Sequence, residues 1–113
     1  MMPTRLGLVA LSIALCGCAA DDAAAPAAPT NLVVSPLGAG AHLTWTDNSS
    51  DESEFIIMRK TGAGTMSELS RVPFNGTSYH DEPITSGTTY VYMIVATNDG
   101  GESESNQATL IAP

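Results

Sequence analysis

Residues 88–98 read TTYVYMIVATN, and this stretch decides the fold. β-Branched and aromatic side chains dominate it, and these residue types are enriched in strands. The turn sequence Asn-Asp-Gly-Gly at residues 98–101 ends the run. Successive side chains of a strand point to opposite faces, so every second residue lines the same face. The face expected to point into the protein carries Tyr90, Tyr92, Ile94 and Ala96.

Working outward from this run, six shorter stretches show a similar period of two between turn signals. They are residues 31–35, 41–46, 54–60, 68–73, 77–80 and 105–112. No window shows a convincing helical period of 3.6 residues. The number and spacing of these runs predict an all-β fold, a seven-stranded antiparallel Ig-like sandwich that occupies residues 30–113.

Three stretches then resemble the fibronectin type III domain family. Residues 43–55 (LTWTDNSSDESEF) are similar to its second strand, the following loop and its third strand. Residues 84–90 (ITSGTTY) are similar to its L-x-P-G-T-x-Y corner, and residues 90–98 follow its Y-x-V-x-V-x-A-x-N strand. The chain departs from the pattern at Ser86, where proline is usual, and at Glu54, where glycine is frequent. Neither departure threatens the fold.

The resemblance implies structural roles for the aromatic residues. Trp45 is expected at the centre of the core, and Tyr90 is expected to form the tyrosine corner, in which its hydroxyl bonds to nearby backbone. Tyr79 is expected to join the core, which leaves Phe74 as the aromatic side chain expected on the surface. The residues expected to pack around Trp45 are Leu43, Phe55, Ile57, Ile84, Tyr90, Tyr92 and Ile94.

Charge and composition exclude several functions. The 113 residues include 12 acidic and 4 basic residues, a formal net charge of −8, and phosphate binding needs clustered Lys and Arg. Nucleic acid is therefore not an expected partner. His42 and His80 are far apart in sequence and are expected on outward strand faces, and no G-x-S-x-G motif occurs. We therefore expect neither an enzyme nor a bound cofactor.

The first residues are typical of an export signal. Arg5 precedes ten almost entirely apolar residues, 6–15, which is too short a run to span a bilayer. The sequence Leu15-Cys16-Gly17-Cys18 resembles the lipobox of bacterial lipoproteins. That resemblance implies cleavage after Gly17, acyl chains on Cys18 and anchoring in a membrane. An ordinary signal peptide with incidental cysteines is the alternative.

The expected organisation has three parts: a lipoprotein signal peptide at 1–17, a lipidated N-terminus with a solvated Ala/Pro/Asp tether at 18–29, and the domain at 30–113. Ala19 is not the aspartate that favours inner-membrane retention in well-studied Gram-negative bacteria. This residue favours the outer membrane as the location within the bacterial cell envelope.

Two candidate sites lie on the expected surface. The outward positions of two neighbouring strands are apolar, and a patch of this kind marks interaction sites, although ordinary strand residues are the alternative. Those positions are Ile56, Met58, Val91, Met93 and Val95.

Acidic loops at one end of the sandwich offer oxygen ligands for calcium, although no EF-hand spacing occurs and a solvated acidic surface is the alternative. Those acidic residues are Asp47, Asp51, Glu52, Asp99 and Glu102.

These observations predict a non-catalytic envelope lipoprotein that contacts an envelope protein or a glycan through its sandwich domain. The alternative is a structural spacer without a specific ligand. An exposed apolar face favours the first function, whereas a uniformly polar surface favours the second.

Overall fold

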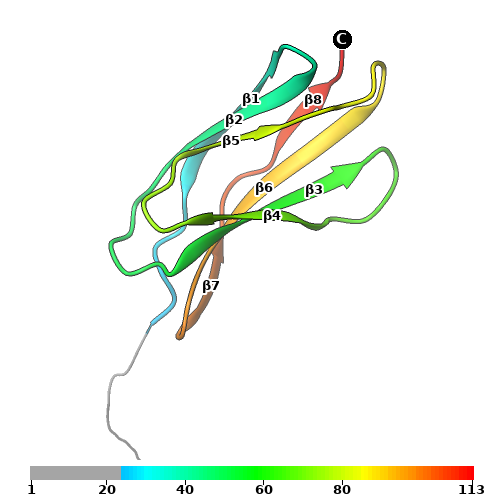
Figure 1. Cartoon of the computed structure of the whole chain (residues 1–113). Helices are drawn as coiled ribbons and strands as arrows, with labels where there is room; N and C mark the ends of the chain where they lie inside the picture. Colours follow the sequence, from blue (N-terminus) through cyan, green and yellow to red (C-terminus); the bar gives the residue numbers. More distant parts are fainter. Residues whose placement is uncertain (1–23) are drawn as a thin grey trace, which may run out of the picture.

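The computed structural model describes residues 24–113. The predicted signal peptide, Cys18 and the first part of the predicted tether lie outside the described residues. Residues 24–113 fold into two antiparallel β-sheets packed face to face, which confirms the predicted sandwich (Figure 1). No helix in this part of the chain has the length and apolar character needed to cross a membrane.

The two sheets differ in size. The smaller sheet contains, in spatial order, β1 (Thr30–Leu37), β2 (Gly40–Thr46) and β5 (Ser78–Asp81). The larger sheet contains, in spatial order, β4 (Ser67–Pro73), β3 (Glu54–Thr61), β6 (Thr89–Asn98) and β7 (Gly101–Glu104), with β8 (Ala108–Ile111) also paired to β6. The chain enters the sandwich beside the β6–β7 turn, and the C-terminus lies at the other end (Figure 1).

The last predicted strand, residues 105–112, differs from the structure because two short strands replace it. β7 and β8 both pair with β6 and are separated by residues 105–107. At this interruption the Asn106 side chain turns toward the other sheet, accepting a hydrogen bond from the Leu32 backbone N–H (3.0 Å) and donating one to the Leu32 carbonyl (3.1 Å). An amide side chain thus takes the place of a strand neighbour and joins the edges of the two sheets.

The core lies between the sheets. Trp45 is 5% exposed and packs edge-on against Phe55, with ring centroids 5.7 Å apart. Ile84 is only partly buried but packs against the same cluster, as does Tyr79. The other residues predicted for the core are all buried: Leu43, Phe55, Ile57, Tyr90, Tyr92 and Ile94.

A tyrosine corner closes the connection between β5 and β6. The backbone N–H of Thr85 donates a hydrogen bond of 2.8 Å to the Tyr90 hydroxyl oxygen. This hydrogen bond lowers the pKa of Tyr90, because an N–H donor stabilises the phenolate more than the phenol. Gly87 lies within the corner at φ +81°, a conformation that side chains disfavour.

Residues 24–29 pack on the domain, which corrects the prediction of a solvated tether reaching residue 29. Pro26 and Pro29 are buried, while the alanines between them are exposed. Prolines three apart lie on one side of an extended polyproline helix, which has three residues per turn. Asn48 Nδ2 donates to the Ala28 carbonyl (3.0 Å) and Asn98 Nδ2 donates to the Ala24 carbonyl (3.1 Å). We call residues 24–29 the docked segment.

Trp45→Ala is expected to lower the free energy of unfolding by about 3–5 kcal/mol, because it leaves a large cavity between the sheets. The indole N–H has no hydrogen-bond partner among the described residues, so the loss is one of packing. Urea unfolding followed by circular dichroism measures the change. Phe74→Ala is the control, because Phe74 is 63% exposed and its loss should change stability by no more than about 0.5 kcal/mol. Equal effects for the two variants would contradict this account of the core.

Candidate functional site

The predicted interaction residues lie on the outer face of β3 and β6. In the antiparallel register Ile56 is opposite Val95, and Met58 is opposite Met93. Val91 lies on the same face, opposite Lys60. Residues directly opposite each other in a sheet point to the same side, so the structure brings the five residues together. We call these five residues the β3–β6 face.

The expected exposure of this face is wrong for three of its five members. Ile56, Met93 and Val95 are 6%, 8% and 4% exposed and form a second apolar cluster. Met58 and Met66, both partly buried, pack against it. The central positions of a sheet face are shielded by their own neighbours, an effect that strand alternation alone does not reveal. Met58 and Val91 are the members of the face that remain partly accessible.

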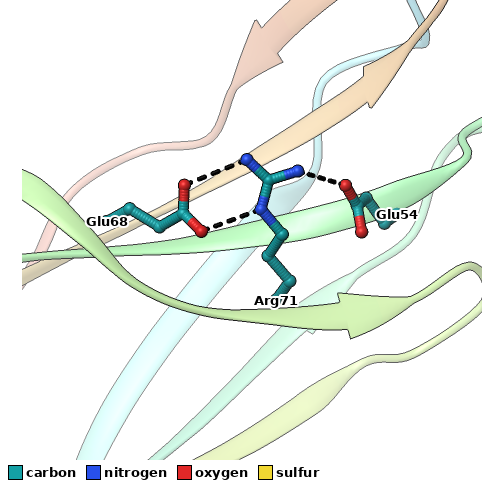
Figure 2. Close-up of polar contacts among 3 residues, drawn as sticks. All are labelled: Glu54, Glu68 and Arg71. Carbon is teal, nitrogen blue, oxygen red and sulfur yellow. Dashed lines mark hydrogen bonds and ion pairs between the residues drawn. The ribbon is translucent and has the colours of Figure 1, made fainter.

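A charged group borders the β3–β6 face on the β4 side. Arg71 lies opposite Ile56 in the register, and its guanidinium bridges two carboxylates (Figure 2). Nε and Nη2 donate to the two carboxylate oxygens of Glu68 at 2.8 and 3.0 Å, and Nη1 donates to Glu54. These hydrogen bonds lower the pKa of Glu68 and raise that of Arg71. The trio gives the face a rim in which one planar cation is held between two anions.

A second polar group joins the two sheets across one end of the core. Asp81, at the end of β5, is 5% exposed and accepts hydrogen bonds from Tyr92 Oη (2.7 Å) and Arg59 Nη1 (2.9 Å). The Arg59 guanidinium carbon also lies 5.5 Å from the centroid of the Tyr90 ring. Arg59 lies opposite Tyr92 in the register and therefore points toward the core rather than over the β3–β6 face.

The pKa values of this inter-sheet group follow from burial and from the carboxylate. Burial, and then the hydrogen bond to Asp81, raise the pKa of Tyr92 far above its usual value, because both disfavour the phenolate. Burial by itself would lower the pKa of Arg59, but the hydrogen bond and negative charge of Asp81 outweigh it and raise that pKa. The group is thus arranged to keep Tyr92 neutral and Arg59 charged.

The predicted acidic loops lie together at one end, but their five carboxylates do not gather around one point. The loop after β2 and the β6–β7 turn are adjacent, since Asn98 Nδ2 donates to the Asp51 carbonyl at 3.3 Å. Within residues 24–113, no three His, Cys, Asp or Glu side chains are grouped so as to hold a metal ion. The structure therefore gives no support to a calcium site built from Asp47, Asp51, Glu52, Asp99 and Glu102.

Glu52 has a structural role at this end instead. It is 7% exposed, and its carboxylate accepts hydrogen bonds from Ser49 Oγ (2.9 Å) and from the Asn75 backbone N–H (2.9 Å). Burial would raise its pKa, but these donors outweigh burial and lower it. Burial raises the pKa of the neighbouring Asp47. Glu52 therefore links the loop after β2 to the β4–β5 turn.

The structure pairs the two histidines that the sequence separates. His42 on β2 lies opposite His80 on β5, with ring centroids 6.1 Å apart on the outer face of the smaller sheet. His80 Nε2 is 2.7 Å from Glu82 Oε1. The sequence indicated that both histidine side chains point outward. It did not show that β2 and β5 are neighbours, which is what brings the two rings together. The part of the chain that the structure describes contains no pocket.

Sequence comparisons find a likeness to a short part of one curated protein. No family model matches the chain. An amylopullulanase from Thermoanaerobacterium saccharolyticum is 31% identical over 94 residues, which cover 82% of this chain and 7% of that protein. The chain thus spans a small fraction of the relative's length.

Solved structures show the fold. The fibronectin type III domain of human collagen XX is 24% identical, with a TM-score of 0.66 over 81% of this chain and 97% of that domain. A structure of titin kinase and its flanking domains is 23% identical, with a TM-score of 0.67 over 80% of this chain and 18% of that one. Pectate lyase Pel3 from Pectobacterium carotovorum is 14% identical, with a TM-score of 0.66 over 77% and 27%. The chain is thus an Ig-like sandwich of fibronectin type III type.

The inter-sheet group predicts a loss of stability at high pH. The folded chain holds the Tyr92 proton to a higher pH than the unfolded chain, whose tyrosines have a pKa of about 10. This contribution is complete below about pH 10 and is lost as the pH rises further, at up to about 1.4 kcal/mol per pH unit. Urea unfolding at a series of alkaline pH values should show a steeper decline for the natural chain than for Tyr92→Phe. Parallel pH profiles would contradict the assignment.

Proposed function

We propose that this chain is a non-catalytic contact module that a lipid on Cys18 holds at a bacterial cell envelope, with the outer membrane as the favoured location. Its sandwich would contact a protein or a glycan partner of the envelope. Cys18 lies outside the described residues, so the anchor rests on the lipobox resemblance at residues 15–18.

The observation that carries the proposal is the way in which the chain enters the domain. Ala24 and Ala28 are bonded to Asn98 and Asn48, so the docked segment starts at the end formed by the β6–β7 turn and the loop after β2. Five residues, 19–23, separate Cys18 from this segment, and five residues reach at most roughly 16–18 Å. Under the proposal, this end faces the membrane, while both sheet faces and the opposite end remain accessible.

The non-catalytic part of the proposal is supported by the use of the buried carboxylates. Asp81 is engaged by Arg59 and Tyr92, and Glu52 is engaged by Ser49 and the Asn75 backbone. Both groups hold elements of the sandwich together. The likeness to a short stretch of a protein named amylopullulanase supports a role beside a glycan for the module, as an accessory rather than as the reacting centre.

A structural spacer is the second candidate function, and one observation favours it. Ile56, Met93 and Val95 are buried, so the apolar area that the β3–β6 face offers to a partner is small. The two ends of the described chain also lie at opposite ends of the sandwich, an arrangement that suits a spacer (Figure 1).

The anchor predicts a specific labelling result. Expressed in a Gram-negative host, the full chain should incorporate labelled palmitate and sediment with membranes. Cys18→Ala should lose both properties, whereas Cys16→Ala should retain them, because Leu15 would occupy the small position before Cys16. Membrane association of Cys18→Ala together with palmitate labelling would contradict the anchor.

Contact through the β3–β6 face predicts position-specific crosslinking. A photoreactive amino acid at Met58, which is partly accessible, should crosslink to an envelope component in living cells. The matched control is Val33, which is 56% exposed on the outer face of the other sheet and should give no equivalent product. The product is identified by mass spectrometry after digestion with protease or glycosidase. Absence of a product at both positions would favour the spacer.

A further inference from the structure

The outer face of β2 and β5 places two imidazoles beside a carboxylate. His42 and His80 are directly opposite in the antiparallel register, and both point away from the core. Their ring centroids are 6.1 Å apart at an interplanar angle of 43°. The Glu82 carboxylate lies beside His80. Neither the proposed contact function nor the packing of the core uses these three side chains.

The contact with Glu82 sets the tautomer of His80. A carboxylate accepts hydrogen bonds, so Nε2, at 2.7 Å from Glu82 Oε1, carries the proton when the imidazole is neutral. The lone pair of His80 is then on Nδ1. In metal sites the ligating histidine commonly donates its other ring N–H to a carboxylate in this way, which orients the ring and raises the basicity of the ligating nitrogen.

Gly40 contributes to the orientation of the His80 ring. A Cβ atom added at Gly40 would lie 2.9 Å from His80 Nε2 and 2.5 Å from the Asp81 carbonyl oxygen. The ring therefore occupies space that a side chain at position 40 would fill. The absence of a side chain at this position allows the His80 ring to lie close to β2.

His42 carries the second observation that points to a ligand. Its Nδ1 is buried and has no hydrogen-bond partner among residues 24–113. A buried polar atom without a partner is costly, and such atoms are rare in folded proteins. His42 Nδ1 thus lacks a hydrogen-bond partner in the described part of the chain, and the neighbouring ring is that of His80, whose lone pair is on Nδ1.

We propose that His42 and His80 bind one divalent transition-metal ion of the zinc or copper class across β2 and β5. Imidazole nitrogen is a preferred ligand of these ions, at about 2.0–2.1 Å from zinc. Two rings bound at that distance have centroids roughly 5–6 Å apart, close to the 6.1 Å that separates the two rings in the structure. Water fills the remaining positions, and the net charge of −8 attracts the cation.

Binding would stabilise the smaller sheet. β5 is an edge strand of four residues, and a metal bridge ties its centre to β2. An ion that binds the folded chain and not the unfolded chain raises the melting temperature with its concentration.

The test is a titration of the purified full chain with zinc chloride and with copper chloride, followed by isothermal calorimetry near neutral pH. Thiols also bind these ions, so the titration is repeated in a C16S/C18S variant, which lacks both cysteines. We expect one ion per chain in the C16S/C18S variant. His42→Ala and His80→Ala should each weaken binding at least about 10-fold, and Glu82→Gln should weaken it by about 10- to 100-fold. Thr44→Ala, on the same face, should bind as the natural chain does.

The melting temperature of each variant without metal confirms that it is folded before its affinity is compared. Zinc should raise the melting temperature of the natural chain and of Thr44→Ala but not that of His42→Ala or His80→Ala. The proposal is overturned if the C16S/C18S variant binds neither zinc nor copper at metal concentrations up to about 1 mM. Unchanged affinity in either histidine variant would overturn it as well.

Discussion

The pairing of β3 with β6 is the constraint on which the rest of the structure depends. The two strands are antiparallel in one continuous register, from Glu54 opposite Thr97 to Thr61 opposite Tyr90. Because strand side chains alternate, this register sends Phe55 and Ile57 into the core and directs the alternate residues to the outer face. A slip of one residue would exchange the two sets and expose the core.

Polar side chains form hydrogen bonds between the two sheets at the margins of the apolar core. Asp81 accepts hydrogen bonds from one residue of β3 and one of β6, so a single buried carboxylate connects the smaller sheet to the larger. Replacing such a group with a bulky apolar residue can stabilise a protein, whereas removing one partner leaves the others buried and unpaired. We infer that the group specifies how the two sheets meet, and that Asn106 does the same at the opposite edges.

The distribution of accessible surface bears directly on function. The docked segment occupies one end of the sandwich, and the outer face of the larger sheet is apolar but largely self-covered. The outer face of the smaller sheet carries paired imidazoles with a carboxylate beside them. The two faces therefore present different groups: a partly accessible methionine, Met58, on one side and two imidazoles on the other.

The sequence by itself predicted all the strands except the last, and the resemblance at residues 43–55 and 84–98 implied the burial of Trp45, Phe55 and Ile57 and the tyrosine corner at Tyr90. The strands depend on alternation and turn residues, and the family motifs are short, so both are local along the chain. Division of the last strand into β7 and β8 was not readable, because it depends on the contact of Asn106 with distant Leu32. Burial of Pro26 and Pro29 was missed because proline-rich sequence indicates a solvated linker when its partner surface is unknown.

The surface sites were decided by tertiary structure. The sequence predicted that Ile56, Met58 and Met93 share an outer face, but only the packed sheet showed how little of that face remains accessible. The sequence likewise placed His42 and His80 on outward faces, yet their contact requires β2 and β5 to be neighbours. Alternation determines which way a side chain points, whereas the pairing of strands determines what it meets, because that pairing joins residues far apart in the chain.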